Sequence, residues 1–229
     1  MQKTEDMFRL LSETSNSFVS VDSIIALSNL IVDLAQSSSG AENSFLMLAN
    51  DDGEMLIQSA RGPCAPSKDY KARVGEGVLG SVASRRLYVA VADLSTDARF
   101  MGMEPDRYLN GPFIACTLVN RGIMLGVLCV SGRRDATAFG ASDLDLISGL
   151  ASHAAVALED ALLMKKLIAK TARLEDANKR LVDIDLEKTE FVARLSYDLR
   201  PPLNAIKGAI YYLRNSDSEK ARRLDFFDI

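Results

Sequence analysis

Residues 112–131 read PFIACTLVNRGIMLGVLCVS. Two apolar runs, 112–119 and 123–131, flank a polar turn, Asn-Arg-Gly, at 120–122. Apolar, β-branched runs of this length are typical of strands, and a turn that contains glycine lets two such strands pair. The stretch therefore predicts an antiparallel hairpin. It does not predict a membrane span, which needs about 20 unbroken apolar residues.

The chain before this hairpin predicts more strands. Residues 43–50 and 54–60 flank Asp-Asp-Gly at 51–53 and form a second candidate hairpin, and residues 87–92 form a further strand. Residues 93–110 are polar and irregular and contain both glycine and proline. We expect this segment to cover one face of the sheet, as ligand-binding loops often do.

Apolar residues recur at helical spacing near both ends of the chain. Residues 3–36 place them at steps of three and four, and residues 142 to about 199 continue the same pattern over a much longer stretch. Helices at both ends of a set of antiparallel strands predict an α+β fold.

A seven-residue repeat runs through the second helical region. Leu167, Leu174, Leu181 and Leu195 share one position of the repeat, and Lys188 fills the missing place. Three positions after members of this series come Ala177, Ile184 and Phe191. The spacing predicts a coiled coil, and one small domain cannot cover so long a helix, so we expect a parallel homodimer. The alternative is a single helix packed on its own domain, which the lysines on the seam would favour.

Composition argues against several functional classes. The 229 residues carry a net charge of −4, one histidine and no tryptophan, so we expect neither a nucleic-acid surface nor a metal site. The cysteines Cys64, Cys116 and Cys129 form no close pair, which is typical of a reducing compartment. The N-terminus is acidic where a secretion signal is basic. These features predict a soluble, cytoplasmic protein that does not span a membrane.

Five short segments carry a family resemblance through their order and spacing. They are VGEGVLG at 74–80, VAD at 91–93, DARF at 97–100, GVLCV at 126–130 and AAVALEDA at 154–161. Together they resemble the GAF domain, a module that senses small ligands or partners, over about residues 20–162. The resemblance implies a mostly antiparallel sheet with the terminal helices on one face and a pocket on the other. It also implies an unidentified small-molecule ligand, without pointing to a particular cofactor.

Gly75, Gly77 and Gly80 also spell G-x-G-x-x-G, the pattern of dinucleotide-binding folds. That pattern binds a pyrophosphate only where a buried strand precedes it and a helix starts after it. The charged residues at 68–73 would make a poor buried strand. We therefore interpret these glycines as a turn rather than as a nucleotide site.

A second resemblance lies in residues 190–206, EFVARLSYDLRPPLNAI. They resemble the phosphoacceptor segment of histidine-kinase dimerisation domains, and the similarity extends over about 188–229. Tyr197 stands where that family has its phosphorylated histidine, Asp198 where it has glutamate, and Pro201 where it has threonine or asparagine. A phenol ionises only near pH ~10, so at neutral pH it is a much weaker nucleophile than an imidazole. We therefore expect no catalytic residue in this segment.

The second resemblance also implies a partial two-helix hairpin. Pro201 and Pro202 should kink the first helix, and a second helix should run through 206–213 and end at 215–218. We expect no ATP-binding domain within the chain, because the Asp-x-Gly-x-Gly pattern of such domains does not occur in it. The predicted order is an N-terminal helix at 1–19, a GAF domain at 20–162, a coiled-coil helix at 163–187 and a degenerate dimerisation segment at 188–229.

The candidate ligand-binding residues are Arg99, Phe100 and Met101 in the irregular segment and Cys116 on the hairpin. The alternative for this segment is an ordinary surface loop that is pinned to the core. His153 has no second histidine to share a haem or metal with, so we expect a surface or packing role. Buried cysteines usually act as small apolar side chains, so thiol chemistry is the less favoured interpretation.

Three functions are compatible with these patterns. The first is a two-component signalling protein, or pseudokinase, whose GAF sensor acts through the coiled coil on a degenerate bundle that binds a histidine kinase or a response regulator. The second is a fragment of a complete GAF sensor histidine kinase with phosphorelay activity. The third is a GAF-type free methionine sulfoxide reductase that would use Cys116.

Overall fold

The computed structural model describes residues 21–103, 108–109, 111–133 and 137–224, without the side chains of 21–23 and 212–224. The helix predicted at 1–19 lies outside the described residues. The chain divides into two units, which meet between Ile168 and Ala169 and are considered separately below.

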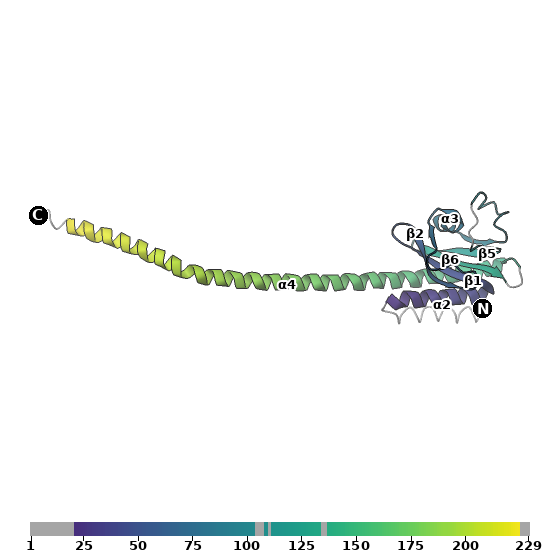
Figure 1. Ribbon diagram of the computed structural model, residues 1–229, viewed down its shortest axis with the longest axis horizontal. Coiled ribbons are helices and arrows are strands. Elements are labelled where there is room, and N and C mark those ends of the chain that lie inside the picture. The colour runs from purple at the N-terminus through teal and green to yellow at the C-terminus, as the bar shows by residue number, and fades with distance from the viewer. Residues whose placement is uncertain (1–20, 104–107, 110, 134–136, 225–229) are drawn as a thin grey trace. The chain divides into compact units, whose positions relative to one another are not determined.

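A six-stranded antiparallel sheet forms the centre of the first unit (Figure 1). Its strands are β1 (Ala41–Ala49), β2 (Glu54–Arg61), β3 (Lys71–Arg73), β4 (Tyr88–Val91), β5 (Phe113–Asn120) and β6 (Ile123–Arg133), in the order β3-β2-β1-β6-β5-β4. Both predicted hairpins are confirmed, as β1–β2 and β5–β6. The β5–β6 turn closes through Arg121 and Gly122, whose φ angles are 47° and 79°. Glycine adopts such left-handed backbone angles without strain, which explains its place in the turn.

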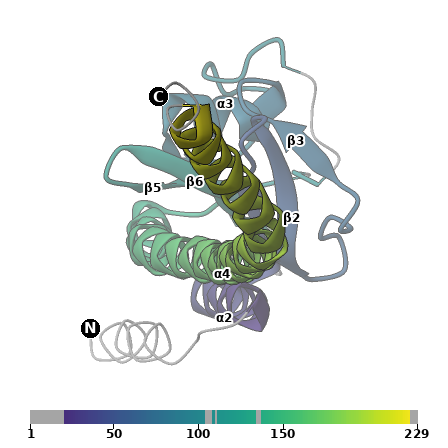
Figure 2. The same ribbon diagram turned by 90° about the vertical axis from the view of Figure 1, so that its left-hand side faces the viewer.

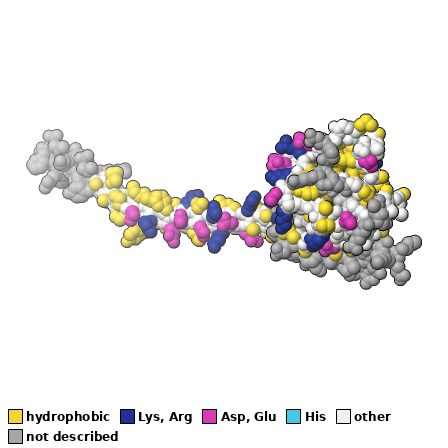
Figure 3. Space-filling view, turned by 45° about the vertical axis from the view of Figure 1, so that its right-hand side comes forward, with side chains coloured by type: hydrophobic (Ala, Val, Ile, Leu, Met, Phe, Trp, Pro, Cys, Tyr) yellow, Lys and Arg dark blue, Asp and Glu magenta, His cyan; other side chains and the backbone are white. Residues whose placement is uncertain are grey.

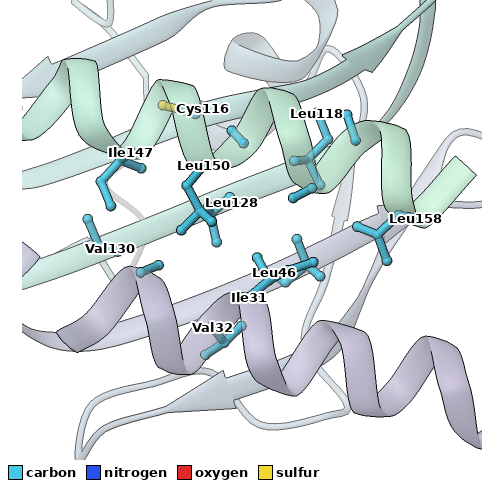
Figure 4. Packing of buried hydrophobic residues seen from close by; sticks show 14 of the residues in the cluster. Ile31, Val32, Leu46, Cys116, Leu118, Leu128, Val130, Ile147, Leu150 and Leu158 are labelled. Carbon is cyan, nitrogen blue, oxygen red and sulfur yellow. The ribbon is translucent and has the colours of Figure 1, made fainter. Parts of the chain in front are cut away.

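Two helices cover one face of this sheet. They are α2 (Val21–Ser39) and the first part of α4 (Ala141–Leu224), and Figure 4 shows their apolar side chains pointing toward those of the strands. Among the buried residues of this layer are Ile31, Leu46, Cys116, Leu118, Leu128, Val130, Ile147, Leu150 and Leu158. The predicted arrangement of terminal helices on a single face, and with it the α+β class, is confirmed.

Helix α3 (Gly77–Arg85) lies on the opposite face of the sheet, as Figure 2 shows. Its buried residues Val78, Leu79 and Val82 pack with Phe45, Phe100 and Phe113 in a second apolar cluster. This helix was not predicted from the sequence, because the glycines at 75–80 also suit a turn.

The structure explains why glycine occurs at positions 75, 77 and 80. Gly75 and Gly77 have φ angles of 90° and 62°, so they do form the turn that leads from β3 into α3. A Cβ atom at Gly80 would overlap the carbonyl oxygen of Arg73, so this glycine lets helix and strand pack closely. Strand β3 is a short edge strand that pairs antiparallel with β2. It therefore does not belong to the parallel β-α-β unit that binds dinucleotides.

The prediction of a two-helix hairpin near the end of the chain is wrong. Helix α4 runs as one helix of 84 residues through Pro201, Pro202 and the expected break at 215–218. A proline removes one backbone donor, but its φ angle suits a helix, and the carbonyls of Tyr197 and Asp198 lie on exposed residues where water can bind them. The polar residues at 215–218 each lower helix stability by less than about 0.7 kcal/mol, which is too little to end it.

Part of α4 is long and apolar enough to cross a membrane by length and composition alone. Within the apolar stretch, 44% of the residues are buried inside the protein, and a single helix of this kind is weak evidence for a membrane span. This was the one such helix found in the described residues. The cytoplasmic location remains a prediction.

Candidate functional site

A cavity of about 440 Å³ opens on the α3 side of the sheet, where the chain leaves β4. Cavities of this size hold small molecules. Its lining is Ala92, Asp93, Leu94, Ser95, Phe100, Met101, Gly102, Met103, Leu109 and Gly111. The predicted irregular segment therefore supplies most of the wall, as expected from its composition.

Asp93 begins this wall with a tight turn. The backbone N–H and the hydroxyl of Ser95 donate to Asp93 Oδ1 at 2.9 and 2.8 Å. The hydroxyl bond, followed by the backbone bond, lowers the pKa of Asp93 below its ordinary value. The cavity thus carries a fixed negative charge at its rim at neutral pH.

Arg99 connects the same segment to strand β4 through hydrogen bonds. Its Nε and Nη2 donate to the two carboxylate oxygens of Asp97 at 2.9 and 2.6 Å, and Nη2 also donates to the carbonyl oxygen of Ala90 at 3.0 Å. Hydrogen bonding to Arg99 lowers the pKa of Asp97, and the same bond raises the pKa of Arg99. Arg99 is therefore a positioning residue for the loop, and it does not line the cavity.

Phe100 and Met101 both line the cavity, but in different ways, and their contact with a ligand stays a prediction. The ring of Phe100 is 1% exposed and belongs to the apolar cluster beneath the cavity. Met101 is 75% exposed and lies at the rim. Asp93 and Ser95 were not among the predicted site residues, although an aspartate two residues before a serine, close to the end of a strand, is a known signal for such a turn.

The structure does not bring Cys116 to this cavity. Cys116 packs between the sheet and helices α2 and α4, on the opposite face (Figure 4). Burial raises the pKa of its thiol to about 12, so it is neutral and unreactive at physiological pH. Cys129 lies opposite Ala115 on β6 and faces the α3 side. The two cysteines therefore point to different faces and cannot form a disulfide with each other.

The remaining candidates are exposed. His153 is an exposed residue of α4, and Cys64 is exposed on the loop after β2. Among the described residues, no group of three or more histidine, cysteine or acidic side chains is arranged to hold a metal ion. In the second unit, Tyr197 is 75% exposed, and Asp198 and Pro201 are exposed beside it.

Residues 22–159 match the family model of the GAF domain, which is more than half of the chain. The chain belongs to the GAF domain family. No curated protein matches it closely enough to be reported.

Solved GAF domains share its fold at low sequence identity. The second GAF domain of DevS from Mycobacterium smegmatis is 21% identical, with a TM-score of 0.53 over 63% of this chain and 99% of that one. The GAF domain of a phosphoenolpyruvate-protein phosphotransferase from Coxiella burnetii is 19% identical, with a TM-score of 0.57 over 71% of this chain and 96% of that one.

A free methionine-R-sulfoxide reductase from Neisseria meningitidis, solved with its substrate, is also similar. It is 16% identical, with a TM-score of 0.54 over 70% of this chain and 90% of that one. These likenesses show the GAF fold. They do not assign a ligand or a reaction to this chain.

Proposed function

We propose that this chain is a dimeric signalling protein of the two-component type. Its GAF domain senses a small molecule, and its long helix carries the signal to a degenerate histidine-kinase dimerisation segment. That segment binds a histidine kinase or a response regulator without transferring phosphate. The kinase association rests on the resemblance of residues 190–206, in which Tyr197 replaces the phosphoacceptor histidine.

The observation that carries this proposal is an exposed apolar stripe along α4. The stripe members Leu167, Leu174, Leu181, Ile184, Phe191 and Leu195 are all at least 42% exposed. Leaving so many large apolar side chains in water is unfavourable, at roughly 25 cal/mol per Å². A second copy would cover them, because their spacing is that of a coiled-coil seam.

The charges beside the stripe favour a parallel, in-register pair. In that arrangement, residues five apart on opposite helices meet, which places Arg180 of one copy next to Asp185 of the other. Within one copy, Arg180 forms an ion pair with Asp176 at 2.8 Å, and both side chains are exposed. Exposed ion pairs contribute little to stability, so Arg180 can exchange Asp176 for another acidic partner at low cost. Lys188 on the seam would lie beside Glu187 of the second copy. Both contacts pair opposite charges.

The surroundings of Tyr197 favour a binding role for this segment rather than phosphate transfer at Tyr197. The side chain is 75% exposed on a continuous helix. Activation of a phenol needs a base positioned within hydrogen-bond distance. Asp198 follows it directly in the helix, and successive helix residues point about 100° apart rather than toward each other.

The test uses the full chain. We expect native mass spectrometry to give twice the chain mass of 25.0 kDa. We also expect no acid-labile phosphate after incubation with ATP and Mg²⁺, alone or with a separate histidine-kinase catalytic domain. Acid-labile phosphate on the unaltered chain would contradict the proposal.

A fragment of a complete sensor kinase is the second candidate, favoured by the resemblance that residues 190–206 keep despite the changes at Tyr197, Asp198 and Pro201. In that case, Tyr197→His would accept phosphate from the added catalytic domain and pass it to a response regulator. Tyr197→Phe is the matched control, because it keeps the ring and removes the hydroxyl. The reductase alternative has lost support, because Cys116 is buried away from the cavity.

A further inference from the structure

Two arginines of the first unit adopt backbone conformations that arginine disfavours. Arg86 ends α3 with φ 54° and ψ 48°, and Arg121 lies in the β5–β6 turn with φ 47°. Among the described residues, they are the two non-glycine residues with a positive φ. Glycine or asparagine is the usual residue at both kinds of position. Residues held in disfavoured conformations gather at functional sites, which points to a role for these two side chains.

The two residues meet at one corner of the domain. Nη2 of Arg86 donates to the carbonyl oxygen of Gly122 at 2.9 Å, so the guanidinium lies beside the residue that follows Arg121. Arg85 directly precedes Arg86, and its Nη1 donates to the carbonyl oxygen of Arg99 at 3.4 Å. Arg85, Arg86 and Arg121 are all exposed. Together these three residues form the arginine corner.

The arginine corner is not neutralised by acidic side chains. In the first unit, every other described arginine forms an ion pair with an acidic side chain; these are Arg61, Arg73, Arg99 and Arg133. Within the described part of the chain, no ion pair joins a corner arginine to a carboxylate. Glu159 approaches Asn120, next to Arg121, but it is buried and its Oε2 accepts the Asn120 amide. The corner is therefore a local excess of positive charge on a chain of net charge −4.

Two large side chains beside the corner are also exposed. Tyr88, two residues after Arg86, is 41% exposed, and Ile123, directly after the β5–β6 turn, is 54% exposed. Arginine and tyrosine are enriched at the energetic centres of protein–protein interfaces, where neighbouring side chains exclude water. Recognition of a charged membrane instead uses clusters of about four to eight lysines and arginines. The composition of the corner therefore favours a protein partner.

We propose that the arginine corner docks an acidic segment of a partner protein, one that also carries apolar side chains. A guanidinium can donate two parallel hydrogen bonds to one carboxylate. Arg86 uses one of its N–H groups on Gly122, and Arg121 makes no side-chain hydrogen bond to the described residues, so both retain donors for a partner. The site depends neither on the kinase resemblance nor on the dimer. A partner seated there would contact the same turn whose Asn120 bonds helix α4.

Peptide binding to the full chain tests this site. The probe is a fluorescein-labelled peptide of three Glu-Glu-Leu repeats, and the uncharged control peptide has three Gln-Gln-Leu repeats. Fluorescence anisotropy should show tighter binding of the glutamate peptide. Arg85→Gln, Arg86→Gly and Arg121→Asn should each weaken it about threefold, because each removes an exposed charge pair, and the triple variant should weaken it at least about tenfold. Arg173→Gln removes an exposed arginine of the second unit and should leave the affinity unchanged.

Thermal unfolding separates loss of the site from loss of the fold. Asparagine before glycine suits the left-handed turn between β5 and β6 better than arginine does. We therefore expect Arg121→Asn to unfold at the same temperature as the unaltered chain or at a higher one, while its peptide binding weakens. A lower unfolding temperature would show that Arg121 serves the turn itself and would contradict the inference.

Two further results would overturn the proposed docking site. Equal affinity for the glutamate and glutamine peptides, or unchanged affinity in all three corner variants, would show that the corner does not recognise acidic segments. Binding to vesicles of equal parts phosphatidylcholine and phosphatidylserine, lost in the triple variant and unaccompanied by peptide binding, would make the corner a membrane surface instead.

Discussion

The side-chain amide of Asn120 donates a hydrogen bond of 2.5 Å to Oε2 of Glu159. Asn120 ends β5, and Glu159 lies on α4 with 7% of its surface exposed. At the same turn, the carbonyl oxygen of Gly122 accepts a 2.9 Å bond from Arg86, the residue that caps α3. One turn therefore contacts both the helix on the cavity side and the helix that leaves the domain. Figure 3, in which side chains are coloured by type, shows acidic and basic side chains interspersed along the exposed part of α4.

Asn120→Ala should lower the free energy of unfolding by about 1–3 kcal/mol, because a buried carboxylate loses a hydrogen-bond donor. Urea unfolding followed by circular dichroism measures the loss. Glu159→Gln is the matched control: it keeps a hydrogen-bonding side chain without the charge, so it should cost less. Equal stability of Asn120→Ala and the unaltered chain would show that the bond contributes nothing.

Gly80→Ala and Gly208→Ala should act in opposite directions. A Cβ at Gly80 would overlap the backbone of Arg73, whereas a Cβ at Gly208 meets nothing within 4 Å in the exposed helix. We expect Gly80→Ala to destabilise the domain by about 2 kcal/mol or more, and Gly208→Ala to stabilise the helix by about 0.5–1 kcal/mol. Thermal unfolding of the two variants compares them. Tolerance of alanine at position 80 would mean that α3 and β3 pack less closely than described.

Phe100→Ala should remove the floor of the cavity and destabilise the GAF domain by about 3–5 kcal/mol. Met101→Ala, at the exposed rim, should change stability by less than about 0.5 kcal/mol. Denaturant midpoints separate the two effects. A similar loss in both variants would contradict the assignment of Phe100 to the core and Met101 to the rim.

Lowering the pH should destabilise the folded chain through protonation of Asp97. Hydrogen bonding to Arg99 lowers the pKa of Asp97 in the folded chain, so this pair stabilises the fold above the unfolded value of 3.8. The contribution is lost as the pH falls through the lower, folded pKa. We expect Asp97→Asn to unfold with a weaker pH dependence below pH ~4 than the unaltered chain, in unfolding midpoints measured from pH ~7 to ~2.5. Parallel curves for the two chains would contradict this role.

Exchanging the charges of Arg180 and Asp185 should test whether the two helices of the dimer run parallel. Arg180→Asp should weaken dimerisation up to about tenfold, because each of two symmetric contacts loses up to about 0.7 kcal/mol. The double variant Arg180→Asp with Asp185→Arg restores opposite charges and should recover most of the affinity. Sedimentation at graded concentrations measures the dissociation constant. A double variant no tighter than Arg180→Asp alone would argue against the parallel register.

Local patterns were enough to predict the two β-hairpins and a long helix that starts near residue 142, but not the continuation of that helix through Pro201, Pro202 and residues 215–218. Side chains alternate between two faces along a strand and return to one face every three or four residues along a helix. Each pattern can therefore be recognised within a short stretch of sequence, such as residues 112–131. The heptad repeat of α4 is local in the same sense. Helix α3 was missed because the glycines at 75–80 suit a turn, and only the tertiary structure shows that Gly80 lies inside the helix, where it packs closely against Arg73.

The sequence alone determined the two β-hairpins, the helical patterns on either side of the strands and the GAF resemblance. The tertiary structure decided which side of the sheet each residue faces. Alternation along β5 groups Cys116 with Ile114 and Leu118, but it does not say whether helices or a cavity cover that group. That choice depends on contacts between residues far apart in the chain, which no local pattern records.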